Sequence, residues 1–199
     1  MGIETVSRHS ATSTSMRIVI CPGMGCDASS NWYRWFAGEM EKRKYVSEII
    51  LRNFPDQPKC RESIWIPFLK NQVGLDADTV VVGHSTGAAC AMRMLEDKEI
   101  DKVRGVILVA AAYTDLGDEW EAASEYFNRP WAWERMREGA EIIQQFHGTD
   151  DHLIPVAEGR YVAQMLEGAN FQYHELPGRS HFFEPFPELL DIMDSKFGA

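Results

Sequence analysis

The chain has 199 residues, of which 45% are hydrophobic and 25% are charged, a composition that fits a single globular domain. Thirty acidic against twenty basic residues give a formal net charge of -10, which disfavours the nucleic-acid phosphate backbone as a partner. No apolar run approaches the roughly 18 residues of a membrane span, and the first fifteen residues lack the apolar centre of a signal peptide. We therefore expect a cytoplasmic protein without nucleic-acid or membrane partners, with a disordered tail over 1–15 and one folded domain over 16–199.

The cysteines show no metal-binding pattern. They form no CxxC pair and lack the histidine spacing of zinc sites, so we predict free, mostly buried thiols and no metal site. A disulfide between Cys21 and Cys26 stays open on spacing alone, although the lack of an export signal argues against it.

Apolar runs of strand length alternate with longer stretches of helical period. The first strand is predicted at 17–21, and the helix that follows, over 31–44, has Ser30 as its expected N-cap. After a second strand at 46–51, Pro58 fits the first turn of a helix that carries RESIWIPFL, and Pro67 should kink or shorten that helix. The other predicted strands are 79–83, 103–111, 141–147 and 171–176, and the other predicted helices are 87–96, 156–166 and 187–196.

Strands of continuous Val, Ile and Leu character, separated by helices, indicate an α/β fold. We predict a mostly parallel sheet of about six strands with helices on both faces, and chemistry at the carboxyl ends of the strands. Residues 113–138 are the least regular part and are predicted to cover one end of the sheet.

A serine lies where a strand meets a helix. The pentapeptide GHSTG, residues 83–87, matches G-x-S-x-G, with Ser85 between an apolar strand and AACAMRML. The glycines allow a turn so tight that the serine backbone is strained and its hydroxyl is held out at the end of the sheet. This context predicts a nucleophile elbow. A glycine-rich turn that only packs helix against strand, or a phosphate-cradling loop, is the alternative.

A serine nucleophile needs a base, and His181 has the best position. It follows the last predicted strand and precedes the last helix, so it should lie at the carboxyl edge of the sheet. His84 adjoins the serine and is expected to face away from it, whereas His147 ends a strand and His174 lies within one. The alternative for His181 is a loop residue that caps the last helix.

Two adjacent aspartates could supply the acid that orients the base. Asp150 and Asp151 follow the strand that ends near His147, and the register of G-x-x-D-x-x-[VI]-P favours Asp151. The other aspartate would then cap a helix or a turn. The order Ser85, Asp151, His181 is that of the α/β-hydrolases.

An oxyanion requires hydrogen-bond donors. The backbone N–H of Thr86 follows the nucleophile at a helix start, and the backbone N–H of Met24, in the loop PGMGC after the first strand, is the second candidate. A dinucleotide site is the alternative for that loop, but it lacks the third glycine of G-x-G-x-x-G. The chemistry needs no metal or organic cofactor.

The sequence resembles the retinoblastoma-binding protein 9 family of small serine hydrolases. The resemblance covers most of residues 16–188 and rests on PGMG, RESIWIPF, VVVGHSTGAACAMR, AAYTDLGDE, YFNRPWAWE, TDDHLIP and GRSHF. It implies a compact, single-domain α/β-hydrolase fold without a large lid, and a catalytic triad of Ser85, Asp151 and His181. The L-x-C-x-E segment falls at 75–79, where Ala77 and Thr79 replace Cys and Glu, so a retinoblastoma-type partner is in doubt.

Two hypotheses about function follow. The first is a serine hydrolase of esterase type that cleaves a small ester, thioester or amide of an amino acid or short peptide through an acyl-enzyme on Ser85. The second is a protein-interaction module with a relic triad, which binds through the surface around NRPWAWERMRE. No substrate-binding residue is predicted. Core is the expectation for each of Trp32, Trp35, Trp131, Trp133 and Phe182.

Overall fold

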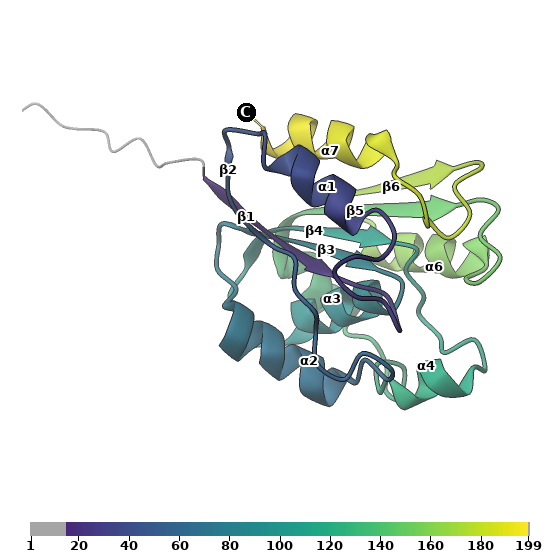
Figure 1. The fold of residues 1–199 in the computed structure, drawn as a ribbon. Coiled ribbons are helices and arrows are strands. Elements are labelled where there is room, and N and C mark those ends of the chain that lie inside the picture. Colours follow the sequence, from purple (N-terminus) through teal and green to yellow (C-terminus); the bar gives the residue numbers. More distant parts are fainter. Residues whose placement is uncertain (1–14, 199) are drawn as a thin grey trace, which may run out of the picture.

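The computed structural model describes residues 15–198 (Figure 1), so all but one residue of the tail expected at 1–15 lies outside the described part. The strands are β1 (Met16–Cys21), β2 (Val46–Ile50), β3 (Thr79–His84), β4 (Val103–Val109), β5 (Ala140–Gly148) and β6 (Phe171–Leu176). The helices are α1 (Tyr33–Met40), α2 (Glu62–Phe68), α3 (Thr86–Glu96), α4 (Glu119–Ala123), α5 (Trp133–Glu138), α6 (Val156–Leu166) and α7 (Pro187–Phe197), with one π-helical stretch, η1 (Leu69–Val73). None of the helices in this range is long and apolar enough to cross a membrane.

All neighbouring strands of the sheet run parallel, in the order β2-β1-β3-β4-β5-β6. This confirms the predicted parallel sheet of about six strands. Because β2 lies on one side of β1 and β3 on the other, the topology reverses between β1 and β3, where open α/β sheets bind ligands. Cys21 at the end of β1 pairs with Gly83 of β3, so the loop after β1 and the turn after β3 are neighbours.

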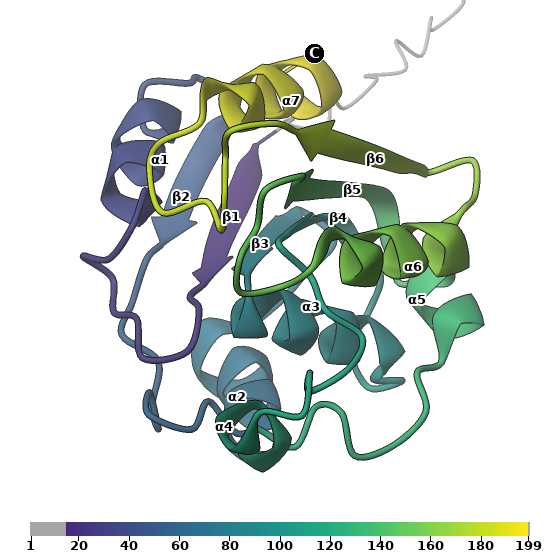
Figure 2. The same cartoon turned by 90° about the vertical axis from the view of Figure 1, so that its right-hand side faces the viewer.

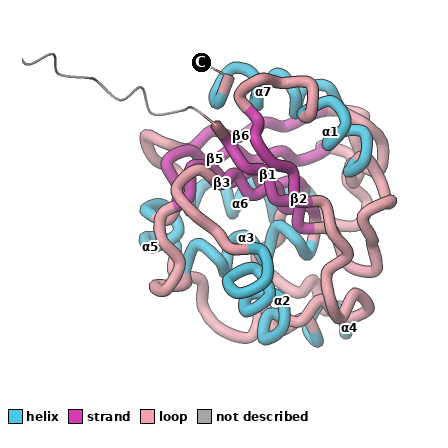
Figure 3. Tube along the Cα trace, turned by 60° about the vertical axis from the view of Figure 1, so that its left-hand side comes forward, coloured by secondary structure: helices cyan, strands magenta, loops and turns pink. Residues whose placement is uncertain are grey.

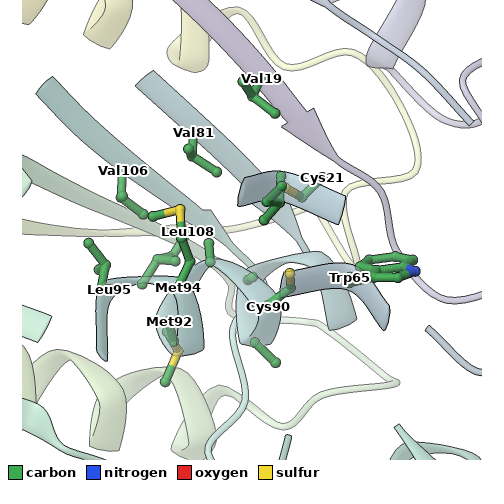
Figure 4. Close-up of a cluster of buried hydrophobic side chains, with 14 of the residues drawn as sticks. Val19, Cys21, Trp65, Val81, Cys90, Met92, Met94, Leu95, Val106 and Leu108 are labelled. Atoms are coloured by element: carbon green, nitrogen blue, oxygen red, sulfur yellow. The ribbon is translucent and has the colours of Figure 1, made fainter. Parts of the chain in front are cut away.

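Helices cover both faces of the sheet, as Figures 1 and 2 show and as the tube in Figure 3 repeats from the other side. α1 and α7 bury one apolar cluster, in which Trp32 and Phe182 are enclosed. α2, α3, α5 and α6 bury the other, where the valines of β1, β3 and β4 face α3 (Figure 4). The predicted strands and all five predicted helices thus form the core, since their apolar residues are what the two layers bury.

Two predicted helix starts are wrong. The Ser30 hydroxyl accepts from the Asp27 N–H and donates to the Asp27 carboxylate, so Ser30 closes a turn and α1 begins three residues later. Pro58 also lies outside its helix: Asp56 accepts from the backbone and guanidinium of Arg61, and α2 begins at Glu62. In both places a local side-chain bond forms a turn ahead of the helix. Pro67 ends regular α geometry as predicted, because α2 passes into η1 directly after it.

Residues 113–138 are held to the core by Arg93 of α3. Its guanidinium is fully buried and donates to the backbone carbonyls of Tyr126, Arg129 and Pro130 and to the Glu96 carboxylate. It also lies 3.6 Å from the centroid of the Trp131 ring. An arginine provides five donors in a fixed fork, which is why one side chain can serve so many acceptors.

Arg93→Met should lower the free energy of unfolding by about 3–5 kcal/mol, because it removes the buried charged partner of Glu96 and the donor to the backbone carbonyls of Tyr126, Arg129 and Pro130. Urea titration measures the change. Arg129→Met is the matched control: its guanidinium pairs with Glu62 but is 47% exposed, so the loss should stay within about 1 kcal/mol. Equal losses from the two variants would contradict the role given to Arg93.

Candidate active site

Ser85 occupies a strained turn between β3 and α3. Its backbone has φ 56° and ψ -123°, and it is partly exposed while both flanking residues are buried. Two glycines make the turn feasible: a Cβ on Gly87 would lie within 3.0 Å of the Cys21 and Pro22 carbonyls, and a Cβ on Gly83 would lie equally close to Gly87. The turn therefore has the strand-turn-helix geometry of a nucleophile elbow, with the serine side chain free of the helix it precedes.

Asp151 and His181 come together at the carboxyl edge of the sheet. His181 Nδ1 donates to Asp151 Oδ2 at 2.8 Å, and both side chains are at least nine-tenths buried. The other carboxylate oxygen accepts from the backbone N–H groups of Leu153 and Ile154, each at 2.9 Å. Burial acts to raise the pKa of Asp151, but the hydrogen bonds to the carboxylate outweigh it and the net pKa is lowered. The aspartate is thus held as an anion against the imidazole.

Asp150 has a different environment. Its side chain is exposed, and its Oδ1 accepts from the Ser180 N–H at 3.2 Å, which ties the loop after β5 to the loop before His181. Of the two aspartates that the sequence leaves open, the structure brings Asp151 to the histidine and Asp150 to the turn.

An open cavity lies in front of Ser85. Its volume is about 500 Å³, and Ser85, His181 and Met24 line it together with side chains from α4 and the loop before α4. Three of the five exposed large apolar residues in the described part of the chain line this cavity: Leu116, Trp120 and Leu153 are 39%, 59% and 50% exposed. Residues 113–138 thus supply part of the wall. None of the five aromatic residues considered from the sequence lines this cavity.

The two candidate oxyanion donors, the backbone N–H groups of Thr86 and Met24, lie in segments next to Ser85. Thr86 is the first residue of α3, so its N–H has no partner within the helix. Met24 follows Gly23, whose Cα packs so tightly on the elbow that a Cβ there would lie 3.3 Å from Ser85 Cβ. The two candidate oxyanion donors therefore belong to segments that meet at Ser85. Within residues 15–198, no group of three or more metal-ligating side chains could hold a metal ion.

A buried chain of three hydrogen bonds, called the relay below, joins these segments. The sequence patterns did not predict it. The Tyr33 hydroxyl accepts from the Gly23 N–H at 2.9 Å and lies 2.7 Å from His84 Nδ1, while His84 Nε2 lies 2.9 Å from the backbone carbonyl of His181. A carbonyl only accepts, so Nε2 carries the hydrogen and Tyr33 donates to Nδ1. Burial lowers the pKa of His84 to about 3, so the ring stays neutral.

Both ring nitrogens of His84 are hydrogen-bonded within the molecule, so neither is free to accept a proton from Ser85. His84 lies behind the elbow and connects the loop after β1 to the backbone of His181. The only sequence signal for this role is its position, directly before the nucleophile at the end of a buried strand. His147 and His174 are likewise engaged elsewhere: His147 Nε2 donates to the Ile154 carbonyl, and His174 bonds to Gln144 and stacks on Phe146.

The parallel sheet, the elbow after β3 and the His181 loop after β6 define an α/β-hydrolase. Among solved structures, the ydeN gene product of Bacillus subtilis has a TM-score of 0.81 at 22% identity, covering 92% of this chain and 100% of that chain. The esterase RhEst1 from Rhodococcus sp. ECU1013 has a TM-score of 0.70 at 16% identity, covering 94% and 92%.

Sequence comparison identifies the family. A family model described as serine hydrolase matches residues 18–183, and serine hydrolase RBBP9 of Rattus norvegicus is 38% identical over 182 residues, or 90% of this chain and 94% of the relative. The chain therefore belongs to the family of RBBP9-like serine hydrolases, and the expected resemblance is confirmed.

Tyr33→Phe should lower kcat with little change in KM, because it leaves the Gly23 N–H and His84 Nδ1 without partners and frees two segments of the site. We expect a stability loss of about 1–3 kcal/mol. Tyr45→Phe is the control, since that hydroxyl donates to Asp194 at the exposed surface. If both variants keep wild-type kcat, the relay does not position the site.

Asp151→Asn should lower kcat by roughly ten-thousand-fold, as in comparable triads, because the amide favours the wrong imidazole tautomer. Asp150→Asn keeps an oxygen for the Ser180 N–H and should change kcat little. Steady-state kinetics and melting temperatures of the two variants separate the roles. A larger rate loss from Asp150→Asn would shift the acid by one residue.

Proposed function

We propose that this serine hydrolase cleaves a small ester, thioester or amide of an amino acid or short peptide through an acyl-enzyme on Ser85. The observation that carries the proposal is the His181–Asp151 hydrogen bond at the wall of the cavity that Ser85 also lines. With Nδ1 bonded to the carboxylate, the imidazole has Nε2 as its free base.

In the proposed mechanism His181 Nε2 takes the Ser85 hydroxyl proton as Oγ bonds to the substrate carbonyl carbon. The carbonyl π electrons move to the oxygen, and the N–H groups of Met24 and Thr86 stabilise the resulting oxyanion. When the tetrahedral intermediate collapses, the leaving group departs with the proton from His181. Water then gives a proton to His181 and attacks the acyl-enzyme, and the acid is released as Ser85 regains its proton.

The cavity supports a small substrate. It is open, and no more than about 500 Å³, which suits an acyl group of amino-acid size better than a folded protein or a long lipid chain. Its rim of Leu116, Trp120 and Leu153 offers apolar contact.

The interaction-module hypothesis is not favoured. The segment around NRPWAWERMRE is bound to the rest of the molecule by Arg93. The Arg93 guanidinium donates to the Arg129 and Pro130 carbonyls of this segment and to the Tyr126 carbonyl just before it, and it stacks on the Trp131 ring. We further propose a cytoplasmic location, supported by four cysteines that are all free thiols.

Ser85→Ala should abolish labelling by a fluorophosphonate probe and turnover of p-nitrophenyl esters. The melting temperature should change little, because the hydroxyl faces the cavity and makes no core contact. Gel fluorescence of purified protein and an ester assay provide the measurements. Labelling that persists in this variant would refute the nucleophile assignment.

Histidine variants complete the same test. His181→Ala should remove nearly as much activity as Ser85→Ala, since members of a triad act as a unit. His174→Ala is the matched control, because its ring contacts Gln144 and Phe146 away from the cavity. Loss of activity in the control alone would mean that the base is wrongly assigned.

A further inference from the structure

A second cavity, called the α5–α6 cavity below, lies where α5 packs against α6 (Figure 2). Its volume is about 450 Å³, close to that of the cavity in front of Ser85, and the two cavities share no lining residue. The wall consists of residues 131–135, Arg137 and Met165 of α6. A cavity of this size can accommodate a small molecule, and the proposed reaction makes no use of it.

Two indole rings form the apolar part of this wall. The centroids of the Trp131 and Trp133 rings lie 5.9 Å apart, and the ring planes are inclined by 37°. Trp131 is fixed in place, because its Nε1 donates to the Tyr113 carbonyl at 2.8 Å and the Arg93 guanidinium lies over its ring. A wall that is already ordered loses little conformational entropy when a ligand binds. The rings therefore present a preformed surface to a flat aromatic group.

Two guanidinium groups provide the positive charge of the wall. Arg135 and Arg137 both line the cavity, and neither forms an ion pair with a carboxylate of residues 15–198. Arg135 Nε is buried without a hydrogen-bond partner in the same range, and Arg137 Nη1 donates to the Met165 carbonyl. The acidic residue of the wall is Glu134, which is exposed. Two arginines against one glutamate leave the wall positive, although the formal net charge of the protein is -10.

An oxyanion would supply the partners that these guanidinium groups lack. A guanidinium stays charged in proteins and presents its N–H groups in a planar fork that matches a carboxylate or a phosphate. A buried donor without an acceptor lowers the stability of the fold, and an acceptor that a ligand brings removes this cost. Because the indole rings belong to the same wall, the anion should be attached to an aromatic ring.

We propose that the α5–α6 cavity is a binding site for an aromatic oxyanion, with Arg135 and Arg137 on the anionic group and the two indole rings against the aromatic one. The site is separate from the cavity in front of Ser85. Its ligand is therefore not the substrate of the proposed reaction, and the inference stands apart from that function. A carboxylic acid and a phosphate monoester share the chemistry that this wall recognises.

Isothermal titration calorimetry tests the site with three probes built on one ring system. 2-Naphthoate and 2-naphthyl phosphate carry the two possible anions, and 2-naphthamide is the neutral counterpart of 2-naphthoate. One anion should bind per chain, at least about tenfold more tightly than the amide, since a hydrogen bond to a charged group contributes at least that factor. The anion that binds more tightly identifies the ligand as a carboxylic acid or a phosphate monoester.

Variants of the wall locate the binding. Arg135→Gln/Arg137→Gln should weaken both anions at least about tenfold and leave the affinity for 2-naphthamide unchanged. Arg34→Gln/Lys44→Gln is the matched control, because it removes the same charge from two exposed residues outside the wall. Trp120→Ala is the second control, since Trp120 lines the cavity in front of Ser85. Neither control should change the affinity for the anions, and the melting temperature is recorded for each variant.

Selective loss of anion binding in Arg135→Gln/Arg137→Gln supports the site. No binding by the wild type, equal affinity for 2-naphthoate and 2-naphthamide, or an equal loss in either control overturns it. If the glutamine variant does not fold, Arg135→Lys/Arg137→Lys decides the outcome: it keeps the charge but not the planar fork, so both anions should still bind about tenfold more weakly. Unchanged affinity in a folded variant of either kind overturns the proposal.

Discussion

The left-handed backbone of Ser85 is the constraint on which the rest of the site depends. A residue with a side chain at φ 56° costs of order 1–3 kcal/mol, and the fold sustains it by packing α3 directly against the ends of β1 and β3. That packing is possible only because Gly83 and Gly87 leave no Cβ between backbones that nearly touch. This turn holds Ser85 at the end of the sheet, next to the first N–H of α3. Gly23 of the loop after β1 packs against the same turn.

The loop after β1, the turn after β3 and the loop after β6 surround Ser85. Hydrogen bonds between uncharged groups hold these three segments together. Gly23, Tyr33, His84 and the His181 carbonyl form one line of hydrogen bonds that connects the segments after β1, β3 and β6. Because burial keeps His84 neutral, this relay adds no charge behind the nucleophile. The carboxylate that binds His181 is Asp151, and the acidic residues that line the cavity itself are Asp118 and Glu121.

Local patterns were enough to predict the strands, the elbow and the residues proposed as the triad, because each depends on neighbours within a few positions. Ser85 needs two glycines, and Asp151 needs a short turn before a helix. Tyr33 and His84 are 51 residues apart, and no periodicity reports their contact. Glu121 also has an ordinary sequence context. It is placed beside the nucleophile by its hydrogen bond with Thr86, which lies 35 residues earlier in the chain. Ser30 and Pro58 are not helix starts, because turns precede both helices. The Asp27 carboxylate accepts from the Ser30 hydroxyl, and the Asp56 carboxylate accepts from the Arg61 N–H.

The position of Glu121 in turn depends on the segments that carry the family resemblance. α4 has only five residues, too few to be stable by itself, so its neighbours must hold it. Asp118 caps its first turn, and the amides of Glu62 and Ser63 at the start of α2 donate to the Ser124 carbonyl and the Glu125 carboxylate. After α4, the Arg93 guanidinium donates to the backbone carbonyls of Tyr126, Arg129 and Pro130. RESIWIPF, DLGDE and YFNRPWAWE thus meet around one short helix, and their shared physical effect is to place a single carboxylate beside the nucleophile.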